Sequence, residues 1–61
     1  MIITAIERYG TVYVYGENNR TLFTKRGQLH SVTSTSVSIR EGNYVYTYNE
    51  RGSRISEHYV G

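Results

Sequence analysis

The sequence contains no cysteine, proline, aspartate or tryptophan in its 61 residues. Without cysteine the chain cannot form a disulfide. With only two histidines, His30 and His58, it lacks the four closely arranged Cys and His ligands of a structural zinc site. A chain of this length buries only ~60% of its unfolded surface, so small domains commonly add a disulfide, a metal or a partner subunit. Self-association is therefore expected, with a monomer that folds alone as the alternative.

Long apolar runs and a strong net charge are also missing. No stretch of 18 apolar residues exists, so no membrane span is expected, and residues 1–4 are too short and uncharged to open a signal peptide. Seven Lys and Arg against five Glu give a net charge of +2, which favours solubility and weak attraction to anions. The default expectation is a cytoplasmic protein.

The residues that are present favour β-structure throughout. Thr, Val, Ile and Tyr dominate, helical periodicity is absent, and turn residues recur at short intervals. The predicted strands cover residues 2–8, 11–15, 20–24, 29–40, 44–48 and 53–60, and the long fourth strand is expected to bend or bulge in its middle. We therefore expect a single all-β domain over residues 1–61: an antiparallel meander of about six strands, in a strongly curved sheet or partly closed barrel.

A repeated phrase assigns the faces of this sheet. Residues 12–17 (VYVYGE) return 33 positions later as residues 45–50 (VYTYNE), which indicates two hairpin-like repeats. Alternation places Tyr44, Tyr46 and Tyr48 on one side of their strand, and the repeat predicts the same side for Tyr13 and Tyr15. One face should therefore carry tyrosines and the other aliphatic residues. The expected aliphatic core is Ile2, Ile6, Val12, Val14, Leu22, Leu29, Val37, Ile39, Val45 and Ile55.

Residues 46–55 (YTYNERGSRI) resemble the tyrosine–aspartate (YD) repeat of Rhs and teneurin-type shells, whose pattern reads Tyr-x-Tyr-Asp-x-x-Gly-Arg-Leu. Residues 13–22 match it more loosely. Asn49 replaces the aspartate of the pattern, and Ser53 is an extra residue between Gly52 and Arg54. The resemblance implies a β-hairpin for each copy. Because many units are needed for a shell, two copies imply nothing about encapsulation.

Catalytic patterns are weak, and no enzyme is expected. Ser56, Glu57 and His58 are adjacent, but on a strand Glu57 points away from the other two. The glutamates at 17, 41 and 50 fall in predicted turns, where carboxylates are normally solvated. Phosphate-binding glycine motifs are missing, and a chain this small has little room for a substrate cavity. No cofactor, metal site or catalytic residue is predicted.

Two functions compete for the aromatic and basic residues. The first is a non-catalytic β-module that acts through protein–protein contacts, as a homo-oligomer or with another protein, since interfaces prefer Tyr and Arg. The alternative is a nucleic-acid-binding mini-barrel in which tyrosines stack on bases and Arg or Lys contact phosphates. The candidate contact residues are Tyr44, Tyr46, Tyr48, Tyr13, Tyr15, Lys25, Arg26, Arg51 and Arg54.

Two further alternatives concern these surfaces. The tyrosines can simply pack against one another while the arginines keep the loops soluble. The uncharged, β-prone run from Ser31 to Ser38 is either a strand that docks onto another strand or an ordinary solvated strand.

Overall fold

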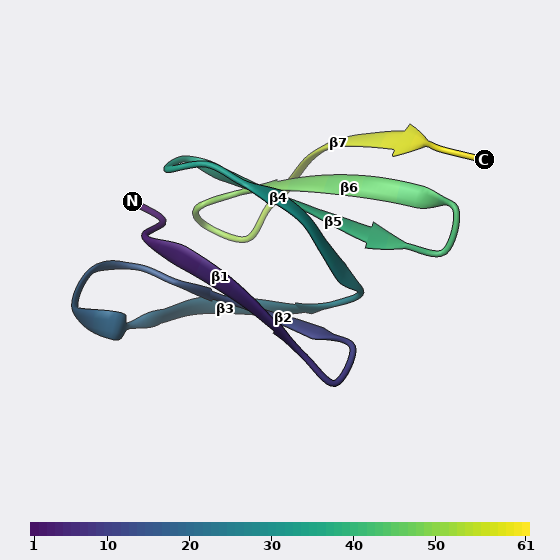
Figure 1. Cartoon of the computed structure of the whole chain (residues 1–61). Coiled ribbons are helices and arrows are strands. Elements are labelled where there is room, and N and C mark those ends of the chain that lie inside the picture. Colours follow the sequence, from purple (N-terminus) through teal and green to yellow (C-terminus); the bar gives the residue numbers. More distant parts are fainter.

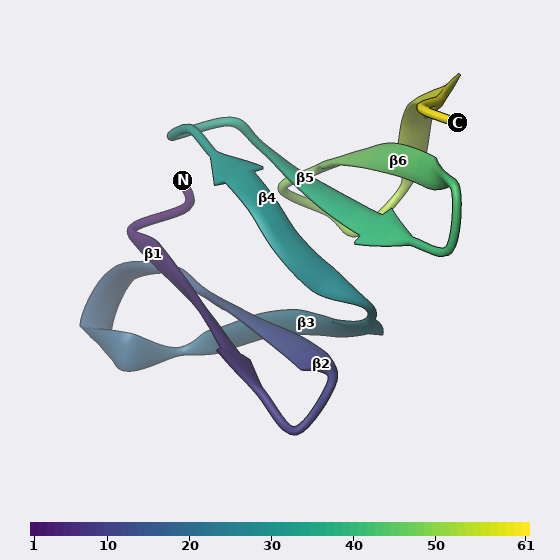
Figure 2. The ribbon, with the colours of Figure 1, turned by 45° about the vertical axis from the view of Figure 1, so that its right-hand side comes forward.

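The computed structural model describes all residues, 1–61, as seven antiparallel strands in two sheets (Figures 1 and 2). The N-terminal sheet has the order β1 (Thr4–Arg8), β2 (Thr11–Tyr15), β3 (Thr21–Arg26). The C-terminal sheet has the order β4 (Gln28–Val32), β5 (Ser36–Glu41), β6 (Tyr44–Asn49), β7 (Arg54–Tyr59). A short 3-10 turn, η1 (Glu17–Asn19), joins β2 to β3. The all-β antiparallel meander is confirmed, whereas six strands and one curved or barrel-like sheet were wrong: the sheets do not close.

The chain passes from one sheet to the other at Gly27, between β3 and β4. Gly27 has φ +132°, a conformation that only glycine adopts easily, and its N–H donates to the carbonyl oxygen of Gly10 at 2.8 Å. A side chain has no room here, because a Cβ atom would lie 2.6 Å from the carbonyl oxygen of Arg40 and 2.7 Å from a methyl of Ile39. The corner therefore brings the two sheets face to face instead of continuing one sheet.

The predicted long strand over residues 29–40 is two strands, β4 and β5, joined at Thr33–Thr35. The Thr33 hydroxyl oxygen accepts hydrogen bonds from the backbone N–H of Thr35 and Ser36, at 3.3 and 3.1 Å. A threonine hydroxyl that accepts such bonds stabilises a turn, whereas β-propensity alone predicts a continuous strand here. Ser31–Ser38 is consequently no single docking strand, because its two halves pair with each other.

The edge between β1 and β4 is partly covered by the N-terminal segment. The backbone N–H of Ile2 donates to the carbonyl oxygen of Ser34, and that of Ile3 to Tyr15, both at 2.8 Å. Further along, a Glu7 carboxylate oxygen accepts a 3.0 Å hydrogen bond from the backbone N–H of Leu29 in β4. The Ile2 and Glu7 contacts tie the two sheets together on this side without forming a continuous ladder, whereas the Ile3 bond extends the pairing of β1 with β2.

The core lies between the sheets and is small. Ile2, Val12 and Val14 meet Val37 and Ile39 there, and all five are buried. Partly buried side chains surround this cluster: Ala5, Leu22, Phe23, Leu29 and Tyr48. Most of the predicted core is thus confirmed, but Ile6 and Ile55 were wrong.

Ile6 is 45% exposed, on the outer face of β1, because it pairs with Tyr13 and not with a valine of β2. Ile55 is 58% exposed in β7, beside the register shift between Thr47 and Tyr48. Neither side chain lies between the two sheets, so neither belongs to the core cluster.

The two copies of the repeated phrase face in opposite directions. In β2 the valines point into the core and Tyr13 points out. In β6 the cross-strand partners of Val37 and Ile39 are Tyr48 and Tyr46, so these tyrosines share the face that lies toward the core. The prediction of separate aliphatic and tyrosine faces was therefore wrong. Val45 is buried on the opposite face, in register with Arg40 and His58.

The outer face of the C-terminal sheet is polar. One cross-strand row consists of hydroxyl side chains on all four strands: Ser31, Ser38, Thr47 and Ser56. Ser38 and Thr47 are hydrogen-bonded to each other at 3.0 Å. Ser31 and Ser56 at the ends of this row are exposed, whereas Ser38 and Thr47 in its middle are half-buried.

Core truncation should be costly in such a thin core. The whole domain is expected to be stable by about 3 to 9 kcal/mol, from typical values per residue. We expect Ile39→Ala to remove about 2 to 5 kcal/mol by leaving a cavity between the sheets. Ile6→Ala, the same change on an exposed side chain, should alter stability by no more than about 0.5 kcal/mol. Urea unfolding at equal protein concentration measures both, and equal losses would contradict the core described above.

A matched pair of glycine substitutions tests the corner. Gly27→Ala should cost about 3 kcal/mol or more, because it combines an unfavourable φ with overlap against Arg40 and Ile39. Gly42→Ala places a methyl in open space at φ +63° and should cost only about 1 to 2 kcal/mol. Thermal unfolding followed by circular dichroism compares the two, and a Gly27 variant as stable as the Gly42 variant would refute the tight corner.

Candidate functional site

An aromatic cluster lies where the C-terminal sheet extends past the N-terminal sheet. The rings of Tyr44 and Tyr46 stack with centroids 5.9 Å apart and planes at 17°, and Tyr59 meets Tyr44 edge-on at 5.3 Å. The Arg54 guanidinium lies 5.1 Å from the centroid of Tyr46. We call these four residues the tyrosine cluster; β6 and β7 supply them through adjacent positions on one sheet face. Such contacts each contribute about 0.5 to 1.5 kcal/mol beyond simple burial.

Tyr48 connects this cluster to the core. Its ring lies 6.3 Å from that of Phe23 in β3, and the Lys25 ammonium lies 4.9 Å from its centroid. Both partners belong to the opposite sheet, so Tyr48 and Lys25 seal the margin between the sheets instead of forming a free binding surface. Burial raises the pKa of Tyr48 above the ordinary value of 10.0, against a smaller opposing effect of the Arg54 charge.

The β6–β7 turn is built around Asn49. Its side-chain oxygen accepts hydrogen bonds from the backbone N–H groups of Arg51 and Ser53, at 2.9 and 3.0 Å. Its backbone N–H donates to the Ser53 carbonyl oxygen at 2.9 Å, and Gly52 turns the chain with φ +84°. An amide oxygen can therefore fill the position that an aspartate holds in the YD pattern, since both offer the same acceptor. Arg51 is exposed in this turn.

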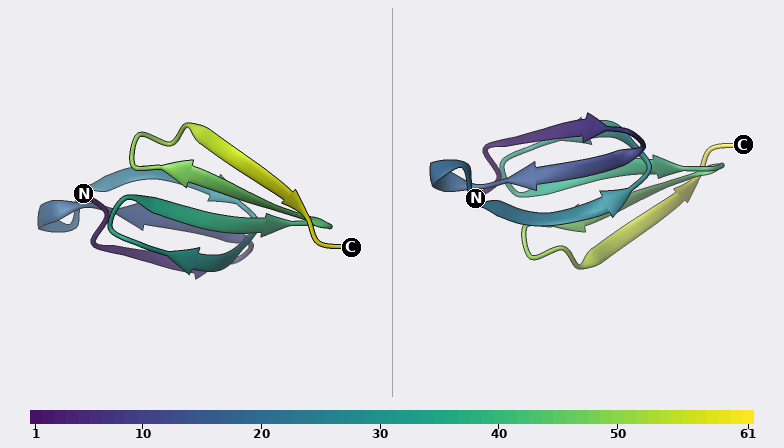
Figure 3. Two further views of the ribbon diagram at one scale, coloured as in Figure 1. Left: turned by 90° about the horizontal axis from the view of Figure 1, so that it is seen from above. Right: turned by 90° about the horizontal axis from the view of Figure 1, so that it is seen from below.

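The edge strand β7 is exposed along its whole length. All six of its residues are exposed, and its only extensive contact is with β6. Figure 3 shows β7 beyond the margin of the N-terminal sheet. Apolar side chains are among the exposed ones: Ile55 is 58%, Tyr59 65% and the following Val60 47% exposed. An exposed edge with apolar side chains is a surface that natural proteins usually cover or protect.

The remaining predicted contact residues lie elsewhere. Tyr13, Tyr15 and Arg26 lie on the outer face of the N-terminal sheet, away from β6 and β7. The structure thus brings together Tyr44, Tyr46 and Arg54, places Tyr48 and Lys25 beside them at the sheet margin, and separates the other three. The sequence analysis missed Tyr59, which the β6–β7 hairpin pairs directly with Tyr44.

No catalytic arrangement is formed by the residues considered for one. Ser56, Glu57 and His58 are all exposed on β7, and Glu57 lies 3.9 Å from Arg54 as an exposed ion pair. No group of three His, Cys, Asp or Glu side chains is placed to hold a metal ion. No helix has the length and apolar character that crossing a membrane requires.

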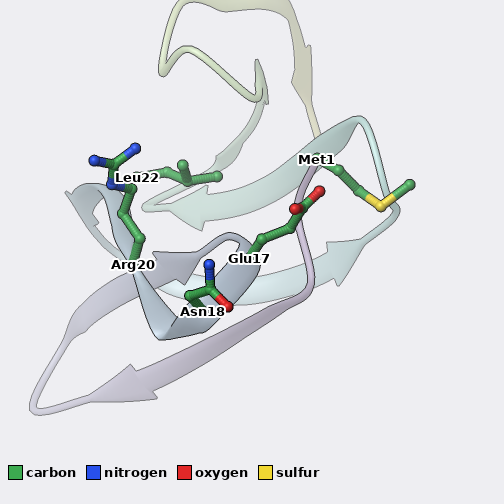
Figure 4. Close-up of a pocket in the computed structure, with 5 residues that line it drawn as sticks. All are labelled: Met1, Glu17, Asn18, Arg20 and Leu22. Carbon is green, nitrogen blue, oxygen red and sulfur yellow. The ribbon is translucent and has the colours of Figure 1, made fainter.

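A pocket of about 540 Å³ opens beside η1 (Figure 4). Its lining residues are Met1, Glu17, Asn18, Arg20 and Leu22. The Met1 amino group forms an exposed ion pair with Glu50 at 3.0 Å, so the N-terminal residue also contacts the β6–β7 turn. Its polar lining consists of one acidic side chain, one basic side chain and one amide, and these groups do not form a set suited to a particular ligand.

Comparison with protein-family models, curated proteins and solved structures finds no match to this chain. The hairpin that the YD resemblance implies is present at β6–β7, but the resemblance itself stays a prediction.

The raised pKa of Tyr48 predicts a loss of stability at high pH. Because the pKa is raised in the folded state, the neutral phenol stabilises the fold fully below pH 10, and this contribution is lost as the pH rises through the folded-state value. Tyr48→Phe should therefore lose less stability than the native chain between pH 9 and pH 11. Denaturant midpoints across this range measure the difference, with Tyr15→Phe as the control; parallel losses in all three proteins would contradict the assignment.

Proposed function

We propose that this chain is a small non-catalytic β-module that acts through protein–protein contacts and pairs with a second copy of itself along the edge of β7. The observation that carries the proposal is the exposure of all six β7 residues beside the tyrosine cluster. The domain has neither disulfide nor cysteine, and its core cluster has five residues, so a partner subunit would supply stabilisation that the monomer lacks.

The free edge offers a regular set of backbone groups. The Val60 N–H donates to the Asn43 carbonyl oxygen at 2.8 Å, and His58 and Ser56 follow in register with Val45 and Thr47. Because backbone groups alternate in direction along a regular strand, those of Glu57 and Tyr59 point away from β6, up to the register shift at Ile55. They are available to an added antiparallel strand.

A second copy fits this edge by symmetry. Two β7 strands related by a two-fold axis perpendicular to the sheet pair antiparallel and cover both free edges in one contact. The same operation keeps both tyrosine clusters on one side of the joined sheet. The exposed Ile55, Tyr59 and Val60 of each copy then lie at or near the seam, where their burial would stabilise the dimer by about 25 cal/mol per Å² of apolar area.

Nucleic-acid binding by the tyrosine cluster, the alternative predicted from the sequence, has weaker support from these contacts. Base stacking needs a free ring face. One face of Tyr46 lies against Tyr44, Arg54 contacts the same Tyr46 ring, and the Tyr48 ring is engaged by Phe23 and Lys25. Rings that already contact other side chains of the protein are better suited to packing against a protein surface than to stacking on bases.

Size-exclusion chromatography with light scattering tests the proposal at micromolar concentration. The native chain should elute with twice its monomer mass. Glu57→Pro should give a folded monomer, because proline removes an outward N–H while leaving the bonds to β6 in place. A native chain that is a monomer and stays folded on dilution would refute self-association.

Glu57→Ala is the matched control. It removes the carboxylate and the ion pair with Arg54 but keeps the backbone N–H, so we expect it to remain a dimer. If the alanine variant also dissociates, the side chain and not the strand edge holds the two copies together, and the edge-pairing model is wrong.

A further inference from the structure

The outer face of the N-terminal sheet carries a row of two arginines with a hydroxyl between them. Arg8 of β1 and Arg26 of β3 are the cross-strand neighbours of Thr11 in β2. Directly paired side chains point to the same face, and strand spacing puts the two arginine backbones about 9.5 Å apart. No segment of the chain covers this face (Figure 3).

Tyrosines lie beside this row on the same face. Tyr13 occupies the next outward position of β2, between Ile6 and Thr24, and Tyr15 follows it. Both residues are half-buried, and neither ring has an aromatic or cationic partner, unlike the rings of the tyrosine cluster.

A third tyrosine projects from the turn next to Arg8. Tyr9 is 98% exposed and has φ +52°, followed by Gly10 at φ +75°. Positive φ at both turn positions is a conformation in which asparagine followed by glycine is favoured and a bulky side chain is strained. The turn therefore holds an aromatic ring in solvent where local backbone preference favours another residue.

The charge on this face has one sign. Neither Arg8 nor Arg26 forms an ion pair; the two pairs in the structure involve Met1 with Glu50 and Arg54 with Glu57. The glutamate of β1, Glu7, pairs with Val12 on the inner face and bonds to the Leu29 N–H. Two unpaired guanidinium groups thus face solvent without a neighbouring carboxylate on the sheet face, an arrangement complementary to phosphate.

We propose that this face binds single-stranded nucleic acid. Arg8 and Arg26 contact backbone phosphates, with the Thr11 hydroxyl between them, and the rings of Tyr9 and Tyr13 stack on bases. An exposed sheet with aromatic side chains suits unstacked bases, whereas reading a duplex requires an element that enters a groove. The surface is separate from β7, so its use does not depend on self-association.

Fluorescence anisotropy with a labelled mixed-sequence 12-nucleotide strand, as DNA and as RNA, tests the proposal from low to moderate salt. The native chain should bind the single strand more tightly than the matching duplex. Arg8→Ala combined with Arg26→Ala should reduce the slope of log affinity against log salt by about 1.4, since each single-strand phosphate contact contributes about 0.7. Arg40→Ala combined with Arg51→Ala makes the same charge change elsewhere and should leave the slope near its native value.

Substitutions of the two rings separate stacking from folding. Tyr13→Ser should weaken binding by about one to two orders of magnitude, whereas Tyr13→Phe keeps the ring and should bind normally. Tyr9→Asn should weaken binding while raising the thermal midpoint, because asparagine suits the left-handed turn.

Absence of binding at low salt, tighter binding of the duplex, or equal effects of the two double arginine variants would overturn the proposal. The Glu57→Pro variant should still bind the strand. Because that variant concerns the edge alone, a failure of edge pairing and a failure of nucleic-acid binding are distinguishable.

Discussion

The corner at Gly27 determines the arrangement of everything else in this protein. Its φ of +132° and the contact with Arg40 and Ile39 turn the chain from β3 into β4. The turn lays β4 and β5 of the C-terminal sheet against the N-terminal sheet (Figure 2). Without it, residues 21–32 would continue as one strand, and Val12 and Val14 would have no valine or isoleucine layer to meet. The small core exists because one backbone position tolerates a conformation closed to other residues.

A second consequence of this corner is the unequal size of the sheets. Three strands cannot cover four, so β7 and part of β6 extend past the region that the N-terminal sheet covers. Tyr44 and Tyr59 therefore meet edge-on outside the core, and Tyr46, which stacks on Tyr44, is also in contact with Arg54. The exposed edge and the cluster arise from the same mismatch in strand number, which is why a contact with a partner would involve both.

Local signals in the sequence were sufficient for most of the strands but not for the break between β4 and β5 or for the arrangement of the strands. Alternation and turn residues predicted β2 and β6 closely, because each is a short run between glycine or asparagine turns. The Thr33 turn was missed because its hydroxyl hydrogen bonds act within a segment whose propensity is β-type. The change of sheet at Gly27 could not be predicted, because turn residues between two strands do not indicate whether the second strand pairs in the same sheet as the first. Among the candidate contacts, chain position could not show that Tyr13 and Tyr46 lie on separate surfaces.

The inversion of the repeated phrase follows from side-chain size and position in the sheet. β2 lies in the middle of its sheet, directly under the other layer, where sheets about 10 Å apart leave room for valine but not for a row of tyrosines. β6 lies at the margin of the overlap, where a long ring such as Tyr48 can reach Phe23 while Tyr44 remains accessible to solvent. The same alternating pattern therefore buries valine in one strand and turns tyrosine inward in the other. Patterning specifies that two faces differ, and the opposing layer decides which of them becomes the core.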